Sequence, residues 1–214
     1  MAADPASSGP LTDVAFTNVI RQVRGVLRLA PPSPMPFNHQ RTPTEHMITL
    51  SKIGWETYAV EIMEAEYLIS LLSPYSMIPT PSMVDSDKHL KLEVDDIEFP
   101  VEGMRHPHVE HVRALLEFGR DFDEETEIVV HCYMGRSRSA AALLLLLVQQ
   151  NPGRIQDVID MVYREALHIK PNGLLVKLGD AELGCEGELI DAVNRMPEPW
   201  TEEFDGIASF PMRL

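Results

Sequence analysis

The hydrophobic pattern of the chain separates short apolar runs from longer stretches with helical spacing, and this pattern starts at Met47. Short runs rich in Val, Ile and Leu predict β-strands. They are MITLSKI (47–53), EYLISLLS (66–73), HLKLEV (89–94) and EIVVH (127–131). Helices are predicted at about residues 55–64, 109–122, 140–148 and 155–166, and helices dominate the second half of the chain. This alternation predicts an α/β fold with a central, mostly parallel sheet flanked by helices.

Three of the predicted helices differ in how much of their surface is apolar. The helix at 109–122 can form one apolar face from Val109, Val112, Leu115, Leu116 and Phe122. The helix at 155–166 follows the helix stop NPG (151–153), and its apolar face is formed by Ile155, Val158, Ile159, Val162 and Ala166. The helix at 140–148 is apolar all round, so we expect it to be central and buried on most sides.

The distribution of proline indicates where the folded domain begins. Residues 30–46, APPSPMPFNHQRTPTEH, are dense in proline, which is typical of an extended linker. We therefore predict an N-terminal extension with a Pro-rich linker at 1–46, a folded domain at 47–196 and a C-terminal tail at 197–214. Residues 11–30 have near-helical apolar spacing with interleaved arginines, which suits either a basic amphipathic helix that docks on the acidic domain or on a partner, or a partly disordered extension. A mitochondrial presequence is the alternative, but Asp4 and Asp13 disfavour it.

The net charge of the chain limits the classes of molecule that it is expected to bind. The chain has 18 basic and 33 acidic side chains, a net charge of -15, which argues against nonspecific binding to nucleic acid or to an anionic membrane. The longest apolar run is shorter than the roughly 20 residues of a membrane-spanning helix, so no membrane insertion is expected. Cys132 and Cys185 form neither a disulfide framework nor a zinc ribbon, and they suit a reducing compartment. The expected location is the cytoplasm.

One loop combines the residues needed to bind and attack a phosphate. The run HCYMGRSRS (131–139) connects a predicted strand to a predicted helix, the position where α/β proteins collect ligands. The helix N-terminus directs backbone N–H groups and a positive dipole at one spot, and Gly135 leaves room for an anion there. Arg138 offers a planar pair of donors that matches two phosphate oxygens. The same positive field would favour the thiolate of Cys132, a nucleophile for phosphoryl transfer.

The same loop resembles a known family. H-C-x5-R-S is the pattern of the cysteine-dependent protein tyrosine phosphatases, and the GxSRS ending resembles their dual-specificity group. IKPN (169–172) resembles a segment at the corresponding place in that group. The order ISLLSP, HLKLEVDDI, HVEHVRALLEF and VVHCYMGRSRSAAA is similar to a small bacterial tyrosine-phosphatase-like family. The resemblance covers about residues 47–196.

The resemblance implies a role for each residue of the loop. Cys132 would be the nucleophile, and Ser139 would ease departure of the thiolate, with a helix cap as the alternative or additional role of its hydroxyl. His131 would orient the loop. The phosphate would be bound by Tyr133, Met134, Gly135, Arg136, Ser137 and Arg138. Arg136 has the equal alternative of a solvated loop residue.

Phosphate-ester cleavage also needs an acid that protonates the leaving oxygen. In the resembled family this is an aspartate on a loop after a strand, and LEVDDIEFP (92–100) offers Asp95 and Asp96. Family spacing favours Asp96, and the other aspartate would cap a turn.

Two further features have alternative explanations. RHPHVEH (105–111) could suggest a metal site, but no acidic or histidine partner stands at a spacing typical of metal ligands. Its histidines are therefore interpreted as helix-start residues near the active site. Cys185 could protect Cys132 as a disulfide, but a buried or incidental cysteine is the favoured interpretation.

The predicted function is a metal-independent phosphatase without a cofactor, which acts through a phosphocysteine intermediate. Its predicted substrate is phosphotyrosine, and a dual-specificity enzyme that also acts on phosphoserine or phosphothreonine is the broader alternative. Phosphorylated protein is the expected substrate. The alternatives are a phosphoinositide or small-molecule phosphatase, disfavoured by a loop without lysines, and a scaffold that binds phosphorylated residues without cleaving them. A sulfurtransferase is disfavoured by the arginine and serine of the motif.

Overall fold

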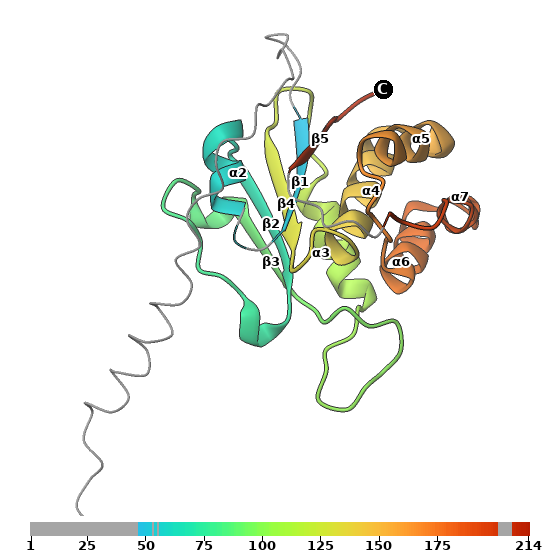
Figure 1. Ribbon diagram of the computed structural model, residues 1–214, viewed down its shortest axis with the longest axis horizontal. Coiled ribbons are helices and arrows are strands. Elements are labelled where there is room, and N and C mark those ends of the chain that lie inside the picture. The colour runs from blue at the N-terminus through green and yellow to red at the C-terminus, as the bar shows by residue number, and fades with distance from the viewer. Residues whose placement is uncertain (1–46, 53, 55, 201–206) are drawn as a thin grey trace, which may run out of the picture. The chain divides into compact units, whose positions relative to one another are not determined.

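The computed structural model describes residues 47–200 and 207–214, except residues 53 and 55 (Figure 1). The predictions for residues 1–46 lie outside this part of the chain. The strands are β1 (Met47–Lys52), β2 (Tyr67–Leu72), β3 (His89–Glu93), β4 (Ile128–Cys132) and β5 (Ala208–Pro211). The helices are α2 (Glu56–Met63), α3 (Val109–Phe118), α4 (Arg138–Gln150), α5 (Ile155–Glu165), α6 (Gly173–Leu183) and α7 (Glu188–Asn194). Two short 3-10 turns, Pro74–Ser76 and Ser86–Lys88, follow β2 and precede β3.

The sheet has five strands in the order β3-β2-β4-β1-β5. The first four strands in the chain run parallel to one another, and β5 pairs antiparallel with β1. The predicted α/β fold with a mostly parallel sheet is therefore confirmed. Because the carboxyl ends of parallel strands meet at one edge, the loops after β2, β3 and β4 come together there.

Helices cover both faces of the sheet, with α2 on one face and α3 to α7 on the other (Figure 1). Successive side chains of a strand point to opposite faces, and β4 follows this rule. Ile128, Val130 and Cys132 belong to the larger core, whereas Val129 packs in the smaller core beneath α2. The strand that carries the predicted nucleophile is thus buried on both sides.

Helix α4 lies at the centre of the larger core. Its side chains from Arg138 to Val148 are all buried, as expected for a helix that is apolar all round. Neighbouring helices approach it closely, because a Cβ atom at Gly179 of α6 would lie 2.0 Å from the Leu145 side chain. Such packing leaves little freedom for the first turn of α4, where the motif residues lie.

Most of the predicted elements agree with the structure to within a few residues. The five apolar positions predicted for residues 155–166 are all buried. Helix α3 ends at Phe118, earlier than predicted, because Gly119 caps it. Phe122 still packs in the core, with its ring 4.9 Å from that of Tyr67.

The prediction of a C-terminal tail at 197–214 is wrong for its last part. Ala208–Pro211 forms β5 and completes the sheet, with Phe210 fully buried. The run is too short and too isolated in the sequence to stand out as a strand, and only its pairing with β1 stabilises it. Among the described helices, none has the length and apolar character needed to cross a membrane.

Candidate active site

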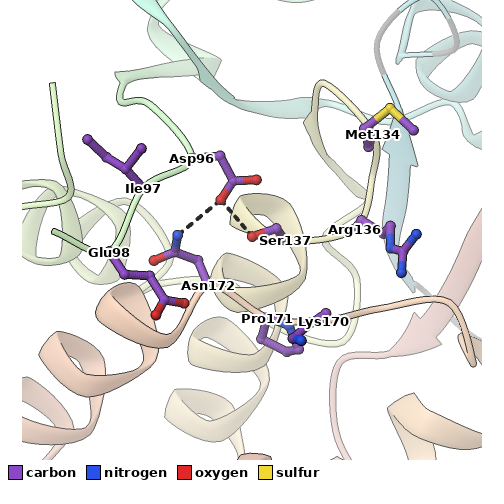
Figure 2. Close-up of a pocket in the computed structure, with 9 residues that line it drawn as sticks. All are labelled: Asp96, Ile97, Glu98, Met134, Arg136, Ser137, Lys170, Pro171 and Asn172. Atoms are coloured by element: carbon purple, nitrogen blue, oxygen red, sulfur yellow. Dashed lines mark hydrogen bonds between the residues drawn. The ribbon is translucent and has the colours of Figure 1, made fainter. Parts of the chain in front are cut away.

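The loop at residues 133–137 connects β4 to α4. Cys132 is the last residue of β4 and Arg138 is the first residue of α4. Met134, Arg136 and Ser137 project from this loop (Figure 2). The H-C-x5-R-S motif therefore lies between a strand and a helix, at the carboxyl edge of the sheet, as the sequence predicts.

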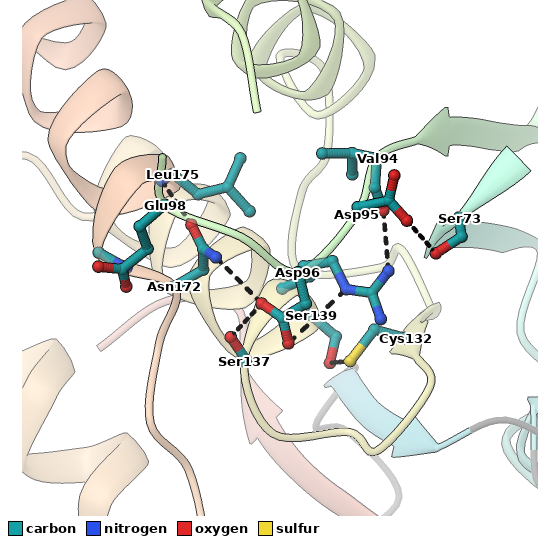
Figure 3. A network of polar contacts seen from close by, with 12 residues as sticks. Ser73, Val94, Asp95, Asp96, Glu98, Cys132, Ser137, Ser139, Asn172 and Leu175 are labelled. Carbon is teal, nitrogen blue, oxygen red and sulfur yellow. Dashed lines mark hydrogen bonds and ion pairs between the residues drawn. The ribbon is translucent and has the colours of Figure 1, made fainter. Parts of the chain in front are cut away.

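Cys132 is hydrogen-bonded by the serine that the motif places seven positions later. Its sulfur accepts a hydrogen bond from Ser139 Oγ at 3.0 Å (Figure 3). Both residues are buried, with Cys132 only 1% exposed. Helix α4 begins at Arg138 with Ser137 in the capping position, so the alternative role of Ser139 as a helix cap is not supported. A hydroxyl donor at this distance stabilises negative charge on the sulfur.

Arg138 carries a buried guanidinium group with unused donor capacity. The residue is 5% exposed, and Nη1 donates to the carbonyl oxygen of Val94 at 2.8 Å. Nε lies 3.9 Å from Asp96 Oδ2 and has no hydrogen-bond partner within the described part of the chain. A buried donor without a partner is costly. An anion bound at the loop would remove this cost.

The structure separates the two candidate acids. Asp95 is 9% exposed and accepts hydrogen bonds from the Ser73 hydroxyl and, at 2.7 Å, from the Arg105 backbone N–H. The Ser73 hydrogen bond is the main cause that lowers the pKa of Asp95. Asp95 therefore stays ionised and anchors its loop, which fits the turn-capping role.

Asp96 faces the loop at residues 133–137, for which the sequence predicts phosphate binding and which is hereafter the phosphate loop. Its Oδ1 accepts hydrogen bonds from Ser137 Oγ at 2.6 Å and Asn172 Nδ2 at 3.0 Å (Figures 2 and 3). Both bonds go to Oδ1, so Oδ2 remains available on the side of Arg138. Of the two aspartates, Asp96 is the one that is hydrogen-bonded to the loop of the motif, through Ser137.

His131 is buried in a chain of polar groups that extends away from the loop. Ser70 Oγ lies 2.6 Å from His131 Nε2 and 2.8 Å from His89 Nε2, and His89 Nδ1 lies 3.0 Å from Thr80 Oγ1. Burial is the main cause that lowers the pKa of both histidines to about 4. A neutral, hydrogen-bonded ring suits the predicted orienting role. Ser70 and His89 are not predicted from the sequence as partners of His131. A serine within an apolar strand is nevertheless a signal of a buried polar contact.

A second segment is attached to the phosphate loop by hydrogen bonds. Residues 168–172, which include IKPN, lie alongside residues 135–137. The bonds join His168 Nε2 to Gly135 O at 3.2 Å, Lys170 N to Arg136 O at 2.9 Å, and Asn172 N to Ser137 O at 3.2 Å. Burial is the main cause that lowers the pKa of His168 to about 4, so its ring is neutral at pH 7. We infer that this segment keeps the loop in shape.

A pocket of about 470 Å³ opens next to the loop (Figure 2). Its lining combines three acidic or amide side chains, two cations, one hydroxyl and three apolar side chains. These are Asp96, Glu98, Asn172, Arg136, Lys170, Ser137, Ile97, Met134 and Pro171. Tyr133, which the resemblance assigns to the phosphate-binding loop, is 54% exposed and does not line this pocket.

The histidines of RHPHVEH act at the start of α3. The His108 backbone N–H donates to His111 Nδ1 at 3.0 Å, and the rings of His106 and His108 stack with their centres 4.3 Å apart. These contacts support the interpretation of the group as helix-start residues. His106 and His108 line a second pocket, of about 700 Å³, together with Asp95.

Cys185 lies in the turn between α6 and α7 and packs partly buried against the larger core. Burial first, and then the charges of Asp180 and Glu188, raise the pKa of its thiol. A thiol with a raised pKa is a poor attacking group at neutral pH. The role of Cys185 as a protecting partner of Cys132 therefore has no support here.

Gly135 occupies a position that only glycine fits, and Gly135→Ala tests this. Its φ is 66°, and a Cβ atom would lie 2.9 Å from the carbonyl oxygen of Ser51. The backbone conformation alone costs about 1–2 kcal/mol for another residue. We expect a lower free energy of unfolding in urea and, for the phosphatase activity that the sequence predicts, a large loss of hydrolysis of an aryl phosphate, because the loop must shift.

Gly153→Ala is the matched control for this change. Gly153 has a similar φ of 76°, but nothing lies within 4 Å of the Cβ position. It should show the conformational cost without the loss of hydrolysis. Equal activity in both variants would contradict the requirement for close approach at Gly135.

Comparison with known proteins agrees with this geometry at the level of the fold. No family model matches the sequence. The MAP kinase phosphatase with leucine-rich repeats protein 2 of Dictyostelium discoideum is 27% identical over 92 residues, which are 43% of this chain and 12% of that relative. The chain therefore matches only a small part of that protein's length.

Solved structures give a more extensive match. The human tyrosine phosphatase-like serine/threonine/tyrosine-interacting protein is similar with a TM-score of 0.50 and 14% identity, over 66% of this chain and 98% of that chain. DUSP15 has a TM-score of 0.49 and 14% identity, over 72% and 98% of the two chains. PTPMT1 in complex with PI(5)P has a TM-score of 0.48 and 17% identity, over 67% and 96%. The similarity at a TM-score of 0.50 shows that the chain has a tyrosine-phosphatase-like fold. The narrower resemblance to a small bacterial family stays a prediction.

Proposed function

We propose that the chain is a cysteine-dependent phosphatase that hydrolyses phosphate monoesters, with phosphotyrosine in proteins as the main substrate and phosphoserine or phosphothreonine as the wider possibility. The observation that carries the proposal is the hydrogen bond from Ser139 Oγ to Cys132 Sγ at the N-terminus of α4. It stabilises a thiolate in the place where a helix N-terminus and a buried arginine attract a phosphate.

In the first proposed step the Cys132 thiolate attacks phosphorus. A sulfur–phosphorus bond forms as the bond from phosphorus to the ester oxygen breaks. Arg138 and the backbone N–H groups of the loop bind the non-bridging oxygens and stabilise the charge of the transition state. Asp96, protonated on Oδ2, gives its proton to the leaving oxygen.

In the second proposed step water releases the phosphate. Asp96 is now a carboxylate and takes a proton from the attacking water. An oxygen–phosphorus bond forms, the sulfur–phosphorus bond breaks, and the electron pair returns to Cys132. Ser139 stabilises the departing thiolate through its hydrogen bond, so one hydroxyl assists both steps.

A scaffold that binds phosphorylated residues is the alternative function. One solved structure with this fold carries the name of a tyrosine phosphatase-like interacting protein. A binding scaffold needs the phosphate loop but no nucleophile. The presence of Cys132, Arg138 and Asp96 together supports hydrolysis.

The test is a panel of phosphopeptides and phosphoinositides, assayed with the full chain in the presence of a chelator. We expect the highest kcat/KM on phosphotyrosine peptides, no effect of the chelator, and a phosphoryl group on Cys132 after an acid quench, detected by mass spectrometry. Loss of turnover with the chelator would contradict the mechanism. Tight phosphopeptide binding without turnover would establish the scaffold instead.

A further inference from the structure

The pocket beside the phosphate loop contains two cations that the proposed chemistry does not use. Arg136 is partly buried and Lys170 is exposed, and both line the pocket. Within the described residues, no hydrogen bond or ion pair engages either side chain. The proposed phosphate contacts come from Arg138 and the loop backbone. These two cations are therefore available for a different group of the ligand.

The acidic side chains of the same pocket are already engaged. Asp96 accepts from Ser137 and Asn172, and Glu98 accepts from the backbone N–H of Gly173 at 2.8 Å at the start of α6. Figure 2 shows Asp96 and Glu98 apart from Arg136 across the pocket. The carboxylates are thus held by neutral donors on one side of the pocket, and within the described part of the chain the side-chain donors of Arg136 and Lys170 remain free to bind an anion.

The fold holds the backbones of Arg136 and Lys170 side by side. Lys170 N donates to the carbonyl oxygen of Arg136 at 2.9 Å, and flanking bonds to Gly135 and Ser137 fix the same two segments in register. Arg136 thus belongs to the phosphate loop itself, and Lys170 to the segment attached to it. An anion bound by both would lie next to the phosphate that the loop is proposed to hold.

We propose that Arg136 and Lys170 form a second anion subsite, which selects phosphotyrosine peptides with an acidic side chain next to the phosphotyrosine. This inference rests on the proposed function, because the phosphate loop must hold the phosphotyrosine. Met134 and Pro171 give the pocket apolar walls that suit a peptide side chain. The acidic net charge disfavours an anionic lipid surface as the source of the second anion.

The test compares two phosphotyrosine peptides that differ only by Glu or Gln next to the phosphotyrosine. At low salt, the full chain should show about fivefold higher kcat/KM on the Glu peptide, the effect of one or two partly exposed ion pairs. Lys170→Gln should reduce this ratio, and the double variant with Arg136→Gln should bring it close to one. High salt should also reduce the ratio, through screening.

Arg164→Gln is the matched control, because it removes one exposed positive charge from α5, outside the pocket. It should keep the full preference for the Glu peptide. A preference that survives in the double variant, or is lost equally in Arg164→Gln, would overturn the subsite. Equal kcat/KM of the two peptides on the unmodified chain would overturn it as well.

Binding measurements separate this inference from the proposed function. If neither peptide is hydrolysed, the phosphatase proposal fails, and calorimetry with the same peptides on the full chain still decides the subsite. About fivefold tighter binding of the Glu peptide supports the subsite, and equal Kd values overturn it. If the double variant loses more activity or affinity on a soluble bisphosphorylated inositol headgroup than on the Glu peptide, the assignment to a peptide is wrong.

Discussion

Cys132→Ser should abolish turnover of phosphate monoesters while phosphate or vanadate still binds. The serine hydroxyl is uncharged at neutral pH and a far weaker nucleophile than a thiolate, so kcat should fall by on the order of 10⁵ to 10⁶, the size of loss seen when a covalent nucleophile is removed. Binding should survive because Arg138 and the backbone of the loop are unchanged. Single-turnover kinetics and calorimetry with vanadate measure the two effects separately.

Cys185→Ser is the matched control for this experiment. It changes the other cysteine of the chain by the same single atom, in the turn between α6 and α7. We expect nearly unchanged kcat/KM, since its thiol has a raised pKa and packs against the core in the turn between α6 and α7. Substantial turnover in Cys132→Ser would remove the basis of the phosphocysteine mechanism. Loss of vanadate binding in that variant would mean that the sulfur, and not the loop, carries most of the affinity.

Asp96→Asn should reduce kcat/KM on a phosphotyrosine peptide by about 10² to 10⁴, the usual contribution of general-acid catalysis. Asparagine keeps an oxygen that can accept the hydrogen bonds of Ser137 and Asn172, so the pocket should keep its shape. It has no proton to give to the leaving oxygen. The loss should shrink for an activated aryl phosphate, whose leaving group hardly needs protonation.

The pH profile gives the same prediction a second readout. A thiolate and a protonated carboxyl acting together give a bell-shaped dependence of kcat/KM on pH, and the alkaline limb reports loss of the acid's proton. Asp96→Asn should flatten that alkaline limb on the peptide substrate. A normal bell in this variant would mean that the proton comes from another group.

Asp95→Asn is the comparison variant from the same loop. It should keep the bell-shaped pH profile of kcat/KM, with a smaller loss of activity. The hydrogen bond from Ser73 lowers the pKa of Asp95, so its carboxylate holds no proton to donate near neutral pH. A lowered pKa in the folded state means that this carboxylate stabilises the fold above its ordinary pKa of 3.8 and that the contribution is lost as the pH falls below that value. A flattened alkaline limb in Asp95→Asn would transfer the acid role to it.

The strand, loop and helix around Cys132 could be predicted from the sequence because each signal is local. A β-branched run, a loop of fixed length and an apolar helix leave few ways to arrange Cys132, Gly135 and Arg138. The helix N-terminus then follows from chain order alone. The same holds for the face of α5, whose spacing of apolar residues predicts the buried positions.

The choice between Asp95 and Asp96 could not follow from local pattern, since the two are neighbours with the same chemistry. Asp95 is turned toward Ser73, 22 residues away, and Asp96 toward Ser137 and Asn172, which are 41 and 76 residues away. Each orientation depends on which distant segment lies on that side of the loop. Only the packing of the sheet and helices determines that.

By itself, the sequence determined the class of the fold and the position of the motif between a strand and a helix, because periodicity and motif spacing act over a few residues. The tertiary structure decided the rest: β5 as a sheet strand, the buried partners of His131, and Lys170 beside Arg136. These contacts join parts of the chain that are far apart in sequence. Their energy comes from burial and hydrogen bonds that exist only once the sheet and α4 have packed, so no short stretch of sequence encodes them.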